Sequence, residues 1–140
     1  MYGFTWFTMN GSYLLMMELK ENKIIQVGKP CKIAFNKGFY VYVGSAMNGL
    51  EQRIRRHTQE NKKMHWHIDY LLKHAKIIKF FYKESKVKEE CMIAKKFEEK
   101  LQPIPGFGSS DCNCKGHLFY GSEKEITNVV DKLCMSAYSF

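Results

Sequence analysis

The sequence predicts an α+β domain in which a small, mainly antiparallel sheet is flanked by helices. Short apolar runs bounded by polar turns fill residues 11–43, and apolar residues recur at helical spacing in 49–58 and 87–101. The 140 residues have the length of one ordinary domain, and no stretch has the composition of a long linker. We therefore predict a single domain over residues 1–140.

Four strands are predicted in the first third of the chain. Residues 11–19 and 23–27 are apolar runs separated by a short polar segment, which predicts one hairpin. Residues 31–35 and 38–43 flank a polar turn that ends in glycine, which predicts a second hairpin. In the last of these strands, alternation assigns Phe39, Val41 and Val43 to one face and Tyr40 and Tyr42 to the other.

The rest of the chain alternates between helices and single strands. Helices are predicted over residues 49–58, 66–74, 87–101 and 123–137, and strands over 76–82 and 118–120. In the first helix, apolar and charged side chains share one stripe at positions i, i+3, i+4 and i+7: Leu50, Arg53, Ile54 and His57. In the clearest helix, 87–101, Glu90 falls within the apolar stripe. Charges that face inward in this way need an oppositely charged partner.

The net charge is concentrated in one segment. The chain carries 22 basic and 14 acidic residues, a net charge of +8, and residues 53–88 hold eleven of the bases but only three of the acids. A local basic patch favours a nucleic-acid backbone, most readily DNA, as partner. The alternative is a lysine-rich face that only keeps the protein soluble. The apolar N-terminal segment has no basic leader and is too short to span a membrane, which favours a cytoplasmic protein.

The inward charges suit phosphodiester hydrolysis. This reaction needs an activated water, stabilisation of negative charge on the phosphorane, and usually a divalent metal held by carboxylate oxygen. Arg53 and His57 supply cationic or polar groups, and Glu90 supplies the carboxylate. Because Mg²⁺ or Mn²⁺ keeps most of its waters, one glutamate is a sufficient protein ligand. The alternative is a buried structural cluster of these three residues without a metal.

Two tyrosine motifs give this site a family resemblance. Gly11-Ser12-Tyr13 and Tyr42-Val43-Gly44, followed by the arginine-bearing helix, resemble the two motifs of the GIY-YIG nuclease superfamily, each with one residue substituted. Residues 65–72, 107–114 and 116–119 look like the DUF123 branch, and the resemblance covers roughly residues 10–120. Without this pairing, the two tyrosines would be interpreted as ordinary strand aromatics.

The resemblance implies a GIY-YIG-like fold and a metal-dependent endonuclease of DNA or RNA, with repair or recombination as its setting. It implies that Tyr13 is the general base, Tyr42 positions the phosphate, Arg53 clamps the phosphate and Glu90 is the sole protein ligand of the metal. His57 matches a histidine found one turn after the arginine in some members. Many members carry an asparagine after the glutamate helix, where this chain has residues 102–105 (QPIP). The alternatives are a catalytically weak or inactive nucleic-acid-binding module of the same fold and a zinc-stabilised protein-interaction domain.

The basic patch supplies the predicted nucleic-acid-binding residues, which are Arg55, Arg56, Lys62, Lys63 and Trp66. The arginines and lysines would contact phosphates, and the indole would stack on an unpaired base. The alternative for Trp66 is a core anchor, together with the tyrosine four residues later.

A second site is predicted from soft ligands in the glycine-rich loop that follows residue 105. Cys112, Cys114 and His117 lie within six residues, and His65 and His67 offer two more ligands. A four-coordinate structural Zn²⁺ would suit thiolates and imidazoles, although Cys-x-Cys is tighter than the usual zinc knuckle. In the alternative, Asp111, His65 and His117 extend a polar active site and the cysteines are small buried side chains.

Overall fold

The computed structural model describes residues 10–27, 32–47, 49–60, 62–64, 66–105, 107 and 116–138. Its elements are β1 (Gly11–Leu19), β2 (Lys23–Gln26), β3 (Lys32–Phe35), β4 (Gly38–Ala46), α2 (Leu50–His57), α3 (His67–Leu71), β5 (Lys76–Glu84), α4 (Glu90–Glu98), β6 (Gln102–Pro103), β7 (Leu118–Gly121), α5 (Glu123–Leu133) and β8 (Ser136–Tyr138). The predicted α+β class is confirmed. None of the described helices is both long and apolar enough to cross a membrane.

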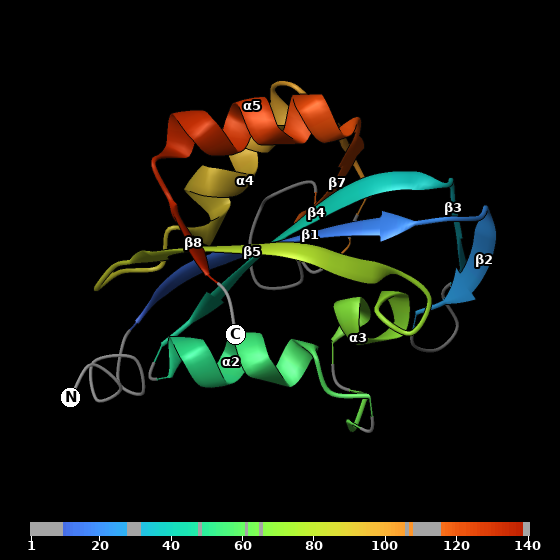
Figure 1. The fold of residues 1–140 in the computed structure, drawn as a ribbon, viewed down its shortest axis with the longest axis horizontal. Coiled ribbons are helices and arrows are strands. Elements are labelled where there is room, and N and C mark those ends of the chain that lie inside the picture. Colours follow the sequence, from blue (N-terminus) through green and yellow to red (C-terminus); the bar gives the residue numbers. More distant parts are fainter. Residues whose placement is uncertain are drawn as a thin grey trace.

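A six-stranded sheet forms the centre of the fold, with strand order β6-β7-β4-β1-β5-β8 and only antiparallel pairs. Helices α2 and α3 cover one face of the sheet, and α4 and α5 cover the other (Figure 1). The strands β2 and β3 form a separate two-stranded sheet next to α3. Both faces of the main sheet are therefore buried.

The strands pair differently from the two predicted hairpins. β1 lies at the centre of the main sheet and pairs with β4 on one side and β5 on the other, whereas β2 pairs with β3. Eight of the nine residues of β1 are buried, so this strand needs long partners on both edges. The nine residues of β4 match β1 along its whole length, from Gly11↔Ala46 to Leu19↔Gly38. The four-residue β2 could pair with only part of it.

Each face of the sheet carries its own core, as the alternation in β4 predicts. Tyr40 and Tyr42 join the core under α2 and α3, together with Tyr13. Val41 and Val43 join the core under α4 and α5, with Phe39 packed against it. The predicted alternation is confirmed, and the two motif tyrosines, Tyr13 and Tyr42, share a face on neighbouring strands.

All four predicted helices are shorter than expected, α2 by only one residue at each end. α3 and α4 are shortened at their ends, and Val87, the first residue of the predicted helix 87–101, is 63% exposed before α4 starts. α5 ends at Leu133, because Cys134 adopts a left-handed conformation (φ 54°) and the chain then forms β8 against β5. The short strand β6 has no counterpart among the predicted strands and pairs with β7.

Candidate functional site

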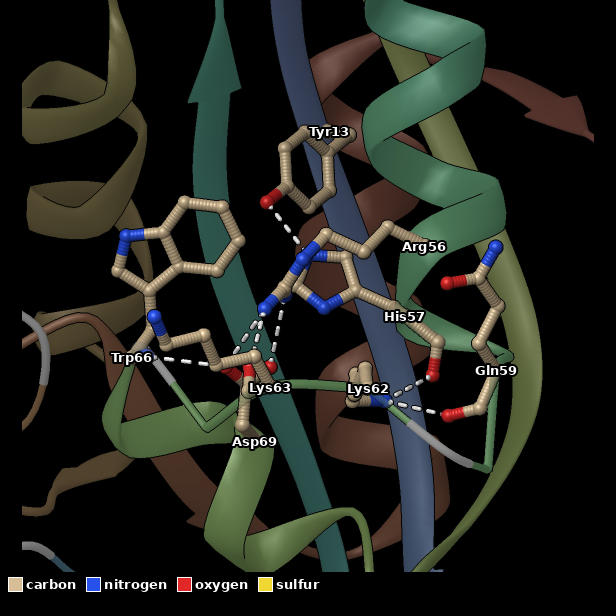
Figure 2. Close-up of polar contacts among 8 residues, drawn as sticks. All are labelled: Tyr13, Arg56, His57, Gln59, Lys62, Lys63, Trp66 and Asp69. Atoms are coloured by element: carbon tan, nitrogen blue, oxygen red, sulfur yellow. Dashed lines mark hydrogen bonds and ion pairs between the residues drawn. The ribbon is translucent and has the colours of Figure 1, made fainter.

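The centre of the site is a hydrogen bond between two buried side chains. The hydroxyl of Tyr13, on β1, lies 2.8 Å from Nε2 of His57, at the end of α2 (Figure 2). Each of these residues is only 2% exposed. The ring of Tyr42 lies nearby, with its centroid 6.5 Å from that of Tyr13 and 6.2 Å from that of His57. The structure thus brings together three of the five predicted catalytic residues on one face of the sheet.

Because Gly44 has no side chain, the ring of Tyr13 can lie directly against the backbone of β4. The two residues are direct partners across β1 and β4. A Cβ atom at position 44 would collide with Cζ and the hydroxyl oxygen of Tyr13. The glycine of the Tyr42-Val43-Gly44 motif is therefore explained by the close approach of a phenol ring to the backbone of the next strand.

Burial keeps the pair uncharged. It lowers the pKa of His57 to about 3, against the opposing effect of Asp69, and the cations Lys62, Arg56 and Arg53 lower the pKa further. Burial also raises the pKa of Tyr13 and of Tyr42 well above the ordinary value. At neutral pH the site therefore holds a neutral imidazole and two protonated phenols. Within the described part of the chain, Nδ1 of His57 is buried without a hydrogen-bond partner.

The lowered pKa of His57 predicts a specific pH dependence of stability. Below pH 6.5 the unfolded chain protonates this histidine, whereas the folded protein does not until about pH 3. The lowered pKa therefore leaves the free energy of unfolding unchanged above pH 6.5 and reduces it as the pH falls from 6.5 towards 3. We expect the free energy of unfolding of the wild type to fall by about 1–2 kcal/mol more than that of His57→Gln between pH 6.5 and pH 5. Urea denaturation at both pH values measures the difference, and equal falls in the two proteins would contradict it.

Ser45 connects the arginine to the glutamate. Nη1 of Arg53 donates to the carbonyl oxygen of Ser45 at 3.1 Å, and the hydroxyl of Ser45 donates to Oε1 of Glu90 at 3.0 Å. Arg53 comes from α2 and Glu90 is the first residue of α4, so the end of β4 joins the two helices. Ser45 was not among the site residues predicted from the sequence, where only its position directly after the motif glycine Gly44 pointed to it.

His117 belongs to the surroundings of Glu90. Its Nδ1 lies 3.6 Å from Oε2 of Glu90, and its Nε2 lies 3.9 Å from Sγ of Cys91. This placement agrees with the alternative in which His117 extends a polar active site. The ring of His67 instead packs against Phe107, at 5.5 Å between centroids.

The other predicted zinc ligands, His65, Asp111, Cys112 and Cys114, lie outside the described residues. Among the described residues, no three His, Cys, Asp or Glu side chains gather into a metal-binding group. Zinc binding therefore stays a prediction.

Glu90 suits a hard divalent cation. Its side chain keeps 22% of its surface exposed, and the hydroxyl of Ser45 is a second oxygen beside it. A Mg²⁺ or Mn²⁺ ion that retains most of its waters needs no more than one or two protein carboxylates. These residues therefore fit such an ion, with Glu90 as its protein ligand.

Of the five predicted nucleic-acid-binding residues, two are exposed and the other three are partly buried against the protein. Arg55 and Lys63 are exposed, although Arg55 also forms an ion pair of 3.5 Å with Glu51. Lys62 is half-buried and donates to two carbonyl oxygens at the end of α2, those of His57 and Gln59, each at 3.0 Å (Figure 2).

Arg56 and Trp66 contact other parts of the protein. The guanidinium of Arg56 forms two hydrogen bonds with the carboxylate of Asp69, at 3.0 and 3.2 Å. The guanidinium carbons of Arg53 and Arg56 lie 4.7 and 4.4 Å from the centroid of the Trp66 ring. Sequence reasoning missed Asp69, whose only signal was its position in the first turn of α3, where a carboxylate caps a helix.

Comparison with known proteins identifies one family. No curated protein and no solved structure shows significant similarity to this chain. One family model matches residues 12–138, almost the entire chain, and its description is "Domain of unknown function DUF123". The protein therefore belongs to the DUF123 family.

Proposed function

We propose that the protein is a metal-dependent endonuclease that hydrolyses phosphodiester bonds in nucleic acid, with a site and a fold of GIY-YIG type. The observation that carries this proposal is the buried, uncharged Tyr13–His57 hydrogen bond beside Arg53, which Ser45 joins to Glu90. The groups match the needs of the reaction: a proton acceptor for the attacking water, a cation for the phosphate and a carboxylate for a metal.

The Tyr13–His57 pair would act as a proton relay. As water attacks phosphorus, the oxygen of Tyr13 accepts a proton from the water, while the hydroxyl of Tyr13 passes its own proton to Nε2 of His57. Before substrate binds, this transfer is unfavourable, because burial raises the pKa of the phenol and lowers the pKa of the imidazole. Negative charge developing on the phosphorane stabilises the imidazolium, so the transfer accompanies the attack.

Arg53 and Glu90 would meet the substrate first, because both keep solvent-exposed surface. The guanidinium of Arg53 binds the oxygens of the scissile phosphate, and Tyr42 positions the phosphate from the same face of the sheet as Tyr13. A Mg²⁺ or Mn²⁺ ion bound to Glu90 would supply electrostatic stabilisation of the negative charge. Arg55 on α2 and Lys63 in the segment that follows this helix are both exposed, and they would contact flanking phosphates.

A second function is favoured by one observation. Tyr13 and His57 are each 2% exposed, so their polar atoms are poorly accessible to a substrate. A nucleic-acid-binding module that has lost efficient catalysis would fit this burial. It would bind DNA or RNA with strong salt dependence and would cleave neither.

Metal-dependent cleavage separates the two functions. We expect the wild type to cut at least one member of a panel of labelled duplex, branched and single-stranded DNA and RNA in Mg²⁺ or Mn²⁺. Glu90→Gln should cut it at least about 100-fold more slowly, because it removes the charged ligand. Glu99→Gln, at an exposed position just after the same helix, is the matched control and should cut normally. Tight binding by the wild type without cleavage in any metal would refute the nuclease proposal in favour of the binding module.

A further inference from the structure

Asp69 is a buried carboxylate that has no part in the proposed reaction. It is 0% exposed, although an isolated buried charge is strongly unfavourable. Its Oδ1 accepts from Nη1 of Arg56, and its Oδ2 accepts from Nη2 of Arg56 and from the backbone N–H of Trp66 at 2.9 Å (Figure 2). The carboxylate thus fixes both an arginine side chain and the start of α3.

Arg56 is directed inward by these contacts. Besides the two bonds to Asp69, its Nη2 donates to the carbonyl oxygen of Lys63 at 2.8 Å. Three of its five N–H donors are therefore already used, and its positive charge is balanced by the carboxylate at 3.0 Å. This geometry makes Arg56 a poor phosphate ligand, in contrast to its predicted role in nucleic-acid binding.

Trp66 joins Arg56 to Arg53. Both guanidinium groups lie over its ring, at 4.4 and 4.7 Å from the centroid, and the ring of His57 is 6.0 Å away. Two arginines that share one ring repel each other unless one of them is neutralised. Asp69 neutralises Arg56. Among the ion pairs between described residues, none includes Arg53, so its charge is left for a substrate phosphate.

We propose that Asp69 is a positioning residue: through Arg56 and Trp66 it holds the guanidinium of Arg53 where the scissile phosphate binds. The ring of Trp66 supports one side of this guanidinium, and the carbonyl oxygen of Ser45 fixes it from β4. Arg56 and Trp66 then act on the substrate only through Arg53. The inference rests on the proposed function, because it assigns Arg53 the task of binding phosphate.

A double-mutant cycle tests this chain of contacts. Asp69→Asn keeps the shape of the side chain and an acceptor for the N–H of Trp66 but removes the charge. We expect it to slow single-turnover cleavage about 10-fold in the wild-type background and by less than about twofold in an Arg53→Ala background. The melting temperature should fall equally in both backgrounds, because the lost ion pair is the same. Asp131→Asn, at an exposed position on α5, is the control and should change neither quantity.

The proposal is overturned if Asp69→Asn slows cleavage by the same factor in both backgrounds, because Asp69 would then act independently of Arg53. If Asp69→Asn does not fold, Trp66→Phe and Trp66→Leu replace it. Phenylalanine keeps an aromatic face for the guanidinium and leucine does not, so only leucine should slow cleavage, and only when Arg53 is present.

The double-mutant cycle of Asp69→Asn and Arg53→Ala also tests the positioning role if the protein cleaves no substrate. In that case the nuclease proposal fails, and the dissociation constant for a short DNA duplex in EDTA replaces the cleavage rate. Asp69→Asn should then weaken binding about threefold when Arg53 is present and not at all when it is absent. Equal weakening in both backgrounds would overturn the positioning role even for a binding module.

Discussion

Arg53→Ala is expected to reduce the single-turnover cleavage rate by about 100–1,000-fold while leaving the protein folded. Arg53 is half-buried beside Tyr13 and Tyr42, and its charge lowers the pKa of both phenols against the larger effect of burial. In the proposed reaction, this substitution removes the cation that binds the scissile phosphate. Quenched-flow or gel-based cleavage with enzyme in excess measures the rate.

Arg55→Ala is the matched control for this prediction. Arg55 lies two residues further along α2, but its side chain is exposed and paired with Glu51. We expect its loss to change the single-turnover rate at saturating enzyme less than about threefold, since a flanking phosphate contact strengthens binding without stabilising the phosphorane. Similar losses in the two variants would show that α2 contributes only general positive charge.

Gly44→Ala is expected to disturb both the fold and the site. The new Cβ would collide with the phenol of Tyr13, which is buried and cannot move without breaking its bond to His57. Overpacking of this kind destabilises a core by about 1–3 kcal/mol, and displacing the hydroxyl should reduce cleavage even in the folded fraction. Chemical denaturation and cleavage assays on the same preparation measure the two effects.

Repeating Gly44→Ala in a Tyr13→Leu background tests whether the collision with the tyrosine ring causes the loss of stability. In Tyr13→Leu the ring atoms that the new Cβ would meet are absent, so Gly44→Ala should destabilise this variant by less than about 1 kcal/mol. An equal loss of stability with and without the tyrosine ring would assign the effect to the backbone of β4 and contradict the role given to Gly44.

Local patterns in the sequence predicted much of the fold. The alternation in β4 placed its tyrosines and valines on the correct faces, and the apolar spacing in α2 placed His57 in the core. Both patterns depend on neighbours along the chain, which the sequence displays directly. Helix ends were less predictable, because α5 ends where Cys134 turns the chain into β8, and that strand is formed only by pairing with β5.

Contacts between distant segments could not be predicted in this way. The two hairpins predicted within residues 11–43 do not form between the described strands. β1 is buried on both faces, and this burial, rather than the nearest turn, selects β4 and β5 as its partners. The same reason explains why Ser45 and Asp69 were missed. Their importance comes from contacts with Glu90 and Arg56, which lie 45 and 13 residues away. The proximity of His117 to Glu90 is likewise visible only in three dimensions.

The central claim is that the hydroxyl of Tyr13 takes part in phosphodiester hydrolysis, and Tyr13→Phe tests it most directly. The measurement is single-turnover cleavage in Mg²⁺ at equal folded concentration, with Tyr120→Phe as the control. Tyr120→Phe also removes one hydroxyl, but the hydrogen bond that this hydroxyl donates to the carbonyl oxygen of Lys37 lies outside the site. We predict that Tyr13→Phe cleaves at least about 100-fold more slowly than the wild type and that Tyr120→Phe cleaves normally. Cleavage by Tyr13→Phe at the wild-type rate would contradict the account.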